Sequence, residues 1–236
     1  MIETMHSPEG TSNAAIAVTY VNHMGSDLSV VNAARVSFGK KHWEFDHVRD
    51  TKLINYLAKH KHISPFGHCF ASFHVKAPIF VARQLVKHKF LRWNEISRRY
   101  VDDEPEFYEP DVWRGRSADK KQGSEGEITT SCVLDVSAEY THPKFAAMVV
   151  NDTSLVVYKR MIEAGVAPEQ ARMVLPQSMM TEWYWSGSLD AFADMCRLRC
   201  KEDTQYESRL VADQVSTIMQ DLFPVSWAAL MEGETV

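Results

Sequence analysis

The chain is poor in the features that mark secreted, membrane and nucleic-acid-binding proteins. It has four cysteines in 236 residues and no Cys-x-x-Cys pair, which argues against a disulfide framework. No window approaches the roughly 18 consecutive apolar residues that cross a bilayer. Residues 1–13 lack the basic-then-apolar order of a signal peptide. The net charge of −5 argues against a general nucleic-acid binder, so we expect a cytoplasmic protein with no membrane or nucleic-acid partner.

The spacing of the histidines and cysteines also does not predict a metal site. His60, His62, His68 and His74 lie close in sequence, but their spacing fits no closed zinc pattern and no His-Glu-x-x-His is present. His68 and His74 are instead expected to be satisfied core or interface histidines. The thiols of Cys69, Cys132, Cys196 and Cys200 are predicted to be reduced and buried, with the last two one helical turn apart.

What is present is the composition of a folded protein, with β patterns early in the chain. A hydrophobic fraction of 45% over this length supports one large core. Residues 15–21 are β-prone, and residues 69–76 alternate, with Ala71, Phe73 and Val75 facing one way. Helices are predicted over residues 50–61, with Leu53, Tyr56 and Leu57 on one face, and from Ile79 to about Phe90.

The second half of the chain is predicted to be helical. One helix spans residues 142–164, with Val149, Val156, Val157, Met161 and Ala164 in register and Gly165 as its cap. A second helix begins at Pro168 and ends before Pro176. A third is capped by Ser188, and a fourth spans residues 205–222. The prediction is a single α+β domain over residues 1–236, with a central, mostly antiparallel twisted sheet flanked by helices. Gly, Ser and charged residues predict a mobile loop near 113–131.

The most informative stretch runs from Pro78 to Tyr100. On the predicted helix, Val81, Ala82 and Leu85 share an apolar face, while Gln84 and Lys87 lie roughly opposite. The positions that follow add cations, amides and one carboxylate: His88, Lys89, Arg92, Asn94, Glu95, Ser97, Arg98 and Arg99. Such a set suits an anion that bears a polar heterocycle.

Three other interpretations of this stretch stay open on the residues alone. It could be a solvated basic helix end, which the helix dipole favours. It could be a patch for single-stranded nucleic acid, with Phe90 and Trp93 as stacking platforms. A nucleophile pair of Ser97 and His88 is a third interpretation, but no third group that would orient the base is evident.

The stretch resembles the signature of flavin-dependent thymidylate synthases, in which Arg-His-Arg is followed by seven residues and a serine. The matching positions are Lys87, His88, Lys89 and Ser97. Residues 73–84 and 94–100 around them are also similar to the family. Further matches, in family order, are residues 34–38, 62–68, 171–176, 198–199 and 205–207, so that the resemblance covers about Ser29 to Phe223. It implies methylation of dUMP to dTMP with FAD as cofactor and NADPH and methylenetetrahydrofolate as co-substrates, without a cysteine nucleophile.

The resemblance also implies a role for each matching residue. It implies that Arg199, Ser97 and Glu95 are catalytic. For dUMP it implies Gln84, Lys87, Glu95, Ile96, Ser97, Arg98, Arg99, Arg172 and Arg199. For FAD it implies His62, Ser64, Lys87, His88, Lys89, Glu95, Ser188 and Asp194. A homotetramer with shared active sites is implied as well, with Arg172 reaching the nucleotide phosphate of a neighbouring subunit.

The chain departs from the family pattern at four positions. Lys87 and Lys89 replace the two signature arginines, which keeps the charge and loses the planar fork. Ser188 and Asp194 stand where asparagines are usual, and a carboxylate accepts hydrogen bonds without donating them. An alternative for Asp194 is an acid in the first turn of a helix.

Overall fold

A four-stranded sheet in the order β1-β2-β8-β3 organises the protein in a computed structural model that describes residues 14–101, 103–118, 123–134 and 139–232. The strands are β1 (Ala17–Met24), β2 (Phe70–Pro78), β3 (Leu91–Glu95) and β8 (Met180–Ser188). β3 and β8 are antiparallel, with Trp93 opposite Trp185. Ala71, Phe73 and Val75 of β2 are buried as the alternation predicts.

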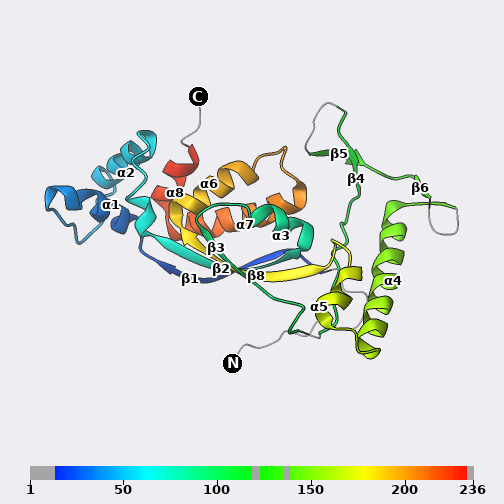
Figure 1. Ribbon diagram of the computed structural model, residues 1–236. Coiled ribbons are helices and arrows are strands. Elements are labelled where there is room, and N and C mark those ends of the chain that lie inside the picture. The colour runs from blue at the N-terminus through cyan, green and yellow to red at the C-terminus, as the bar shows by residue number, and fades with distance from the viewer. Residues whose placement is uncertain (1–13, 102, 119–122, 135–138, 233–236) are drawn as a thin grey trace. The chain divides into compact units, whose positions relative to one another are not determined.

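Helices cover one face of this sheet (Figure 1). They include α3 (Ile79–Leu85), α6 (Leu189–Arg199) and α7 (Tyr206–Leu222). The Phe192 ring of α6 meets the Phe73 ring edge-on at 5.1 Å and the Trp185 ring at 5.5 Å. This aromatic cluster fixes α6 on the strands, and therefore fixes the residues at both ends of α6.

A second group of helices packs beside the first: α1 (Asp27–Arg35), α2 (Arg49–Lys59) and α8 (Pro224–Glu232), with short 3-10 turns η1 (Val36–Phe38) and η2 (Phe66–His68). Buried Asp50 of α2 accepts a hydrogen bond from the Arg35 guanidinium at 2.6 Å. The Asp27 carboxylate accepts from the backbone of Val225 and Ser226, at the start of α8. Charged hydrogen bonds thus join α1 to both neighbours.

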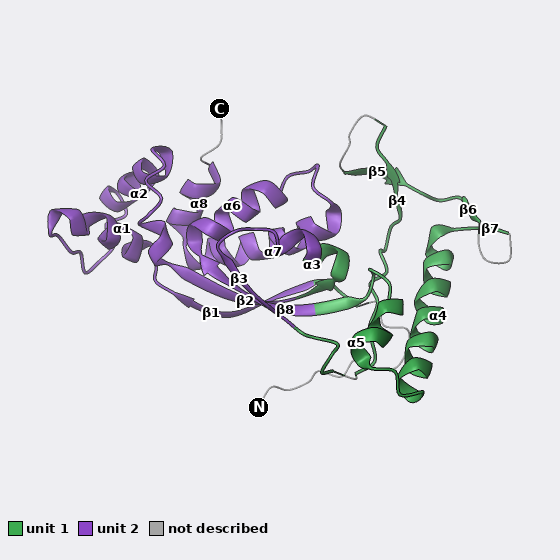
Figure 2. Ribbon diagram, viewed as in Figure 1, with its two compact units in different colours: residues 1–16, 76–82, 96–181 green, residues 17–75, 83–95, 182–236 purple. Residues whose placement is uncertain are grey.

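The chain divides into two compact units (Figure 2). One comprises residues 17–75, 83–95 and 182–236 and contains most of the sheet. The other comprises residues 1–16, 76–82 and 96–181. It contains α4 (Pro143–Glu163), α5 (Pro168–Ala171), η3 (Arg172–Val174) and two hairpins, β4 (Arg114–Arg116) with β5 (Ser124–Glu127) and β6 (Val133–Leu134) with β7 (Tyr140–Thr141).

The predicted mixed α and β fold is confirmed, and two local predictions are wrong. The second half is not wholly helical, because β8 alternates buried Thr181, Trp183 and Trp185 with more exposed residues. The helix predicted to reach Phe90 ends at Leu85, and Phe90 has φ +65°. The loop predicted near 113–131 contains the β4–β5 hairpin, while residues 119–122 lie outside the described residues.

The burial of several side chains does not follow the predicted helix faces. On α4 the buried residues are Pro143, Asn151, Ser154 and Tyr158, whereas Val149, Val156 and Val157 are exposed. On α2, Ile54 and Leu57 are buried and Tyr56 is exposed. All four thiols are free, as predicted, but Cys132 is exposed. Apolar periodicity marks one face of a helix and does not say what covers it.

No helix in the described part of the chain is long and apolar enough to cross a membrane.

Candidate active site

The amide of Gln84 is held by the start of α7. The Gln84 Nε2 group donates to Gln205 Oε1, and the Ser208 hydroxyl donates to Gln84 Oε1 at 2.9 Å. Gln205 in turn donates to the buried carboxylate of Glu207 at 3.3 Å. Both atoms of the Gln84 amide are therefore oriented before any ligand arrives. Gln205 and Glu207 lie in a matching motif but had no predicted role.

Arg199 and His88 form the central polar contact of the larger unit. Arg199 is the last residue of α6, and its Nε donates to His88 Nε2 at 3.0 Å. Burial, with a smaller effect of the Arg199 charge, lowers the pKa of His88 to about 4. His88 is therefore neutral near pH 7 and serves as an acceptor. Within the described residues the guanidinium makes no further hydrogen bond, so its terminal nitrogens can meet a ligand.

The turn after α3 places the lysines on either side of His88 in solvent. Because α3 ends at Leu85, residues 86–90 form a turn, and the His88 backbone donates to the Leu85 carbonyl at 3.1 Å. Lys87 and Lys89 are exposed, and His88 between them is partly buried. Two cations thus flank a neutral imidazole, instead of lining a helix as the sequence predicted.

The strand β3 presents an aromatic side chain and a carboxylate from the same face. The Trp93 ring stacks on the buried Trp183 at a centroid distance of 4.3 Å, and its Nε1 donates to Glu95 Oε2 at 3.1 Å. The indole therefore positions the Glu95 carboxylate. Because Trp93 is committed to the sheet, it is no free platform for stacking a base.

The smaller unit contains the other predicted nucleotide contacts, and they are more exposed. The Ser97 hydroxyl accepts from the Arg99 backbone at 3.4 Å and from Arg99 Nε at 3.3 Å. Arg98 donates to the Asp103 carbonyl, and Ile96 is exposed. Arg172 is exposed in η3, and its Nε donates to the Glu169 carbonyl at 3.2 Å. These bonds are local, so the segment is less constrained than the contacts around Arg199.

Four of the predicted flavin contacts lie near η2 or at α6, which pack together, namely His62, Ser64, Ser188 and Asp194. His62 and Ser64 are exposed in the turn before η2, and the His62 ring stacks on exposed Tyr56 at 6.1 Å. Ser188 is the N-cap residue of α6, but its side chain makes no capping bond. The Ser188 hydroxyl stands at the start of an 11-residue helix and makes no capping bond, so it can donate to a phosphate oxygen. Ser188 therefore fits the phosphates of a flavin dinucleotide. Tyr56 was predicted to share a helix face with Leu53 and Leu57, and the structure shows that it is exposed and stacked on His62.

Asp194 and the histidines need corrections. Asp194 is not in the first turn of α6, where Asp190 lies; it is in mid-helix and pairs with Arg197. His74 is partly exposed and pairs with Glu182 at 3.0 Å, and His68 is exposed, so neither is a core histidine, while the predicted interface role stays a prediction. The Ser97–His88 nucleophile pair gains no support, because Arg199 occupies the imidazole nitrogen that would act as base. Over the described ranges, no three His, Cys, Asp or Glu side chains could hold a metal ion.

Taken together, the fold and these side chains define an α+β protein with an oriented amide and arginine for an anionic heterocycle. A family model described as "Thymidylate synthase complementing protein" matches residues 19–225. Flavin-dependent thymidylate synthases from Thermus thermophilus and Kosmotoga olearia are each 39% identical to the chain over 91% of its length. These alignments cover 75% and 89% of the two relatives. The chain belongs to the flavin-dependent thymidylate synthase family.

Solved structures agree with this assignment. The chain is similar to PolB from Streptomyces cacaoi, described as a UMP/dUMP methylase and bound with 5-Br dUMP, with a TM-score of 0.78. The two chains are 30% identical, and the match covers 93% of this chain and 96% of PolB. The predicted family and fold class are therefore confirmed, while the roles of individual residues stay predictions.

Proposed function

We propose that the chain catalyses the flavin-dependent reductive methylation of dUMP to dTMP, with methylenetetrahydrofolate as carbon donor and NADPH as reductant. The observation that carries the proposal is the Arg199 side chain, which neutral His88 holds through Nε at 3.0 Å. The two terminal nitrogens remain for the carbonyl edge of a pyrimidine. A fixed cation there stabilises negative charge as it develops on the ring.

Gln84 and Glu95 support the same nucleotide. The Gln84 amide is oriented by Gln205 and Ser208, and the Glu95 carboxylate by Trp93. Oriented groups lose little freedom when the substrate binds, which lowers the entropic cost of reaching the reactive geometry. We assign the phosphate to Ser97, Arg99 and Arg172, because arginine forks match phosphate oxygens.

The residues that would hold FAD are His62, Ser64 and Ser188, with Lys87 and Lys89 as nearby cations. When bound, the flavin supplies hydride chemistry that no side chain can supply. The imidazole of His88 is a neutral acceptor here, so the anionic cofactor meets its charge partners at the lysines. Tyr56, stacked on His62, offers a flat aromatic surface beside these residues.

The central test is product formation with and without flavin. Purified protein is stripped of flavin and assayed with dUMP, methylenetetrahydrofolate and NADPH, then assayed again after FAD is added. We expect dTMP only in the second assay. Equal turnover in both would overturn the proposal. UMP run in parallel shows whether the substrate range resembles that named for PolB.

We further propose a cytoplasmic homotetramer in which each active site uses residues of two subunits, and both compact units act as one catalytic domain. Exposed Arg172 and the exposed valines of α4 support an assembly of this kind. An Arg172→Ala chain mixed with a Ser97→Ala chain should recover activity that each homo-oligomer lacks, because some sites then contain both intact residues. A verified mixed oligomer without recovery would exclude shared sites.

A further inference from the structure

The cysteine pair of α6 has no place in the proposed reaction. Cys196 is buried and Cys200, the C-cap residue, is partly buried. The Cys200 backbone donates to the Cys196 carbonyl at 2.8 Å, so the last helical turn is intact. The Cys196 thiol donates to the Ala212 carbonyl at 3.6 Å. Cys196 and Cys200 lie one helical turn apart and line the same cavity.

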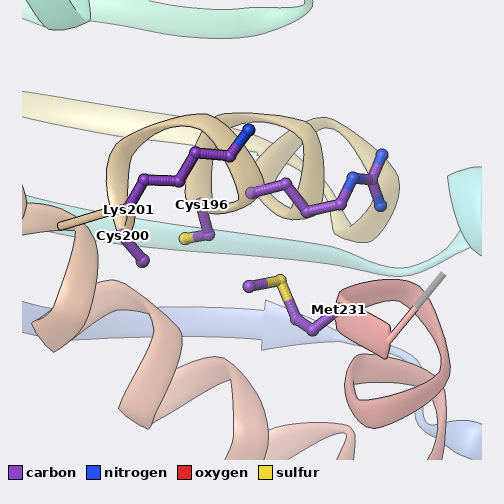
Figure 3. A pocket seen from close by; sticks show the side chains of 5 residues that line it. Cys196, Cys200, Lys201 and Met231 are labelled. Atoms are coloured by element: carbon purple, nitrogen blue, oxygen red, sulfur yellow. The ribbon is translucent and has the colours of Figure 1, made fainter. Parts of the chain in front are cut away.

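A third sulfur atom reaches the same place from another helix. A cavity of about 260 Å³ is lined by Cys196, Arg197, Cys200, Lys201 and Met231. Figure 3 shows Met231 extending from α8 toward the end of α6 that carries the two cysteines. The lining contains two thiols, a thioether and two cations, and no carboxylate. This set disfavours hard cations such as Mg²⁺ and Ca²⁺, which need oxygen ligands.

Thiolate and thioether sulfurs are the ligands that soft metal ions prefer. A monovalent ion held by two thiolates leaves one net negative charge, which a lining cation can balance. Arg197 is already engaged by Asp194 and by the Leu230 carbonyl at 2.8 Å. Lys201 is exposed at the cavity and is the better candidate for this role. The charge balance therefore favours a monovalent soft ion.

We propose that this cavity binds one monovalent soft metal ion of the Cu⁺ type, with Cys196 and Cys200 as thiolate ligands and Met231 as a thioether ligand. Two S–H bonds break and two S–Cu bonds form, two protons leave to solvent, and the oxidation state of the metal does not change. The proposed dUMP reaction uses neither thiol, although Cys200 directly follows Arg199 in the chain.

The experiment is an anaerobic Cu⁺ titration of the flavin-loaded protein against bicinchoninate, a Cu⁺ chelator of known affinity. We expect one ion per chain and sulfur-only coordination by X-ray absorption. Cys196→Ser and Cys200→Ser should each weaken binding by more than about 100-fold, and Met231→Leu, which conserves volume, by roughly 10-fold. Cys132→Ser removes an exposed thiol outside the cavity and should change nothing.

The proposal is overturned if the serine variants bind Cu⁺ as the parent does, or if Cys132→Ser abolishes binding. Should a serine variant fail to fold, Met231→Leu and the coordination shell decide the matter. Nitrogen or oxygen ligands in that shell, together with unchanged affinity of Met231→Leu, would exclude the site.

Discussion

The two parts of the family signature differ in how firmly the chain holds them. Around His88 the side chains are partly buried and joined to distant elements, as in the Arg199–His88 and Ser208–Gln84 contacts. From Ile96 to Tyr100 the side chains are mostly exposed, and the hydrogen bonds of Arg98 and Arg99 reach no further than five positions along the chain. The first part is therefore held by contacts with distant elements, whereas the hydrogen bonds of the second part are local.

The two parts are therefore expected to contribute differently to catalysis and to binding. Groups already oriented by packing lose little entropy on binding and can act on the transition state. Exposed arginines must be ordered by the substrate, so their contacts serve affinity first. Mutations in the two parts should therefore separate into effects on kcat and effects on binding.

The largest expected effect comes from Arg199→Lys. The variant keeps a cation but loses both the Nε contact with His88 and the planar fork toward the ring. We expect kcat to fall by roughly one to three powers of ten, with a smaller change in KM for dUMP. Steady-state kinetics and dUMP binding measure the two effects separately. A raised KM with normal kcat would show that Arg199 only holds the ground state.

The next effect concerns the lysines that replace the family arginines. We expect a nearby arginine to supply the missing fork, so Lys87→Arg with Lys89→Arg should gain little FAD affinity. Arg98 is engaged by the Asp103 carbonyl, whereas Arg92 is exposed on β3, which makes Arg92 the better candidate. Arg92→Ala should weaken FAD binding by about 1–3 kcal/mol if one charged contact is lost.

Arg98→Ala is the matched control for that experiment, and fluorescence titration of FAD is the measurement. Unchanged affinity in both alanine variants would exclude compensation and return the two arginines to solvated surface.

An effect of similar size, on stability, tests the packing of β3 against β8. Gly187 of β8 lies against β3, and an added Cβ would come within 2.4 Å of Leu91 Cδ2 and 3.2 Å of the Phe90 carbonyl oxygen. Gly187→Ala should lower the free energy of unfolding by about 1–3 kcal/mol through overpacking. Gly67→Ala, where the nearest atom is 3.8 Å away, is the control. Equal urea midpoints for both variants would show that β3 is not packed tightly there.

The smallest effect is a pH dependence from His88. Its pKa falls from an ordinary 6.5 to about 4 in the folded chain, so the unfolded chain binds more protons between these values. Stability from this residue is therefore lost as pH falls from 6.5 toward 4, by about 1 kcal/mol after allowance for its partial exposure. The free energy of unfolding of the parent and of His88→Gln, measured at pH 7 and pH 4.5, isolates the contribution of His88. An equal loss in both proteins would assign the pH dependence to other groups.

The sequence by itself determined the family, the fold class and the identity of the candidate residues. The alternation of Ala71, Phe73 and Val75 predicted β2, and Pro168 with Pro176 bounded α5 and η3, because strand pleat and proline geometry act locally. The alternating buried residues Trp183 and Trp185 carried a signal for β8 as well, which a helical interpretation of the second half passed over.

Tertiary structure alone decided how those residues are arranged. Packing between distant segments ends α3 at Leu85 and brings neutral His88 to Arg199, 111 positions away. It also leaves Tyr56 exposed beside His62. Burial and long-range hydrogen bonds set these features, and neither is encoded in local periodicity. The same reason explains the exposed valines of α4, because a sequence specifies an apolar face and only the assembled fold specifies its partner.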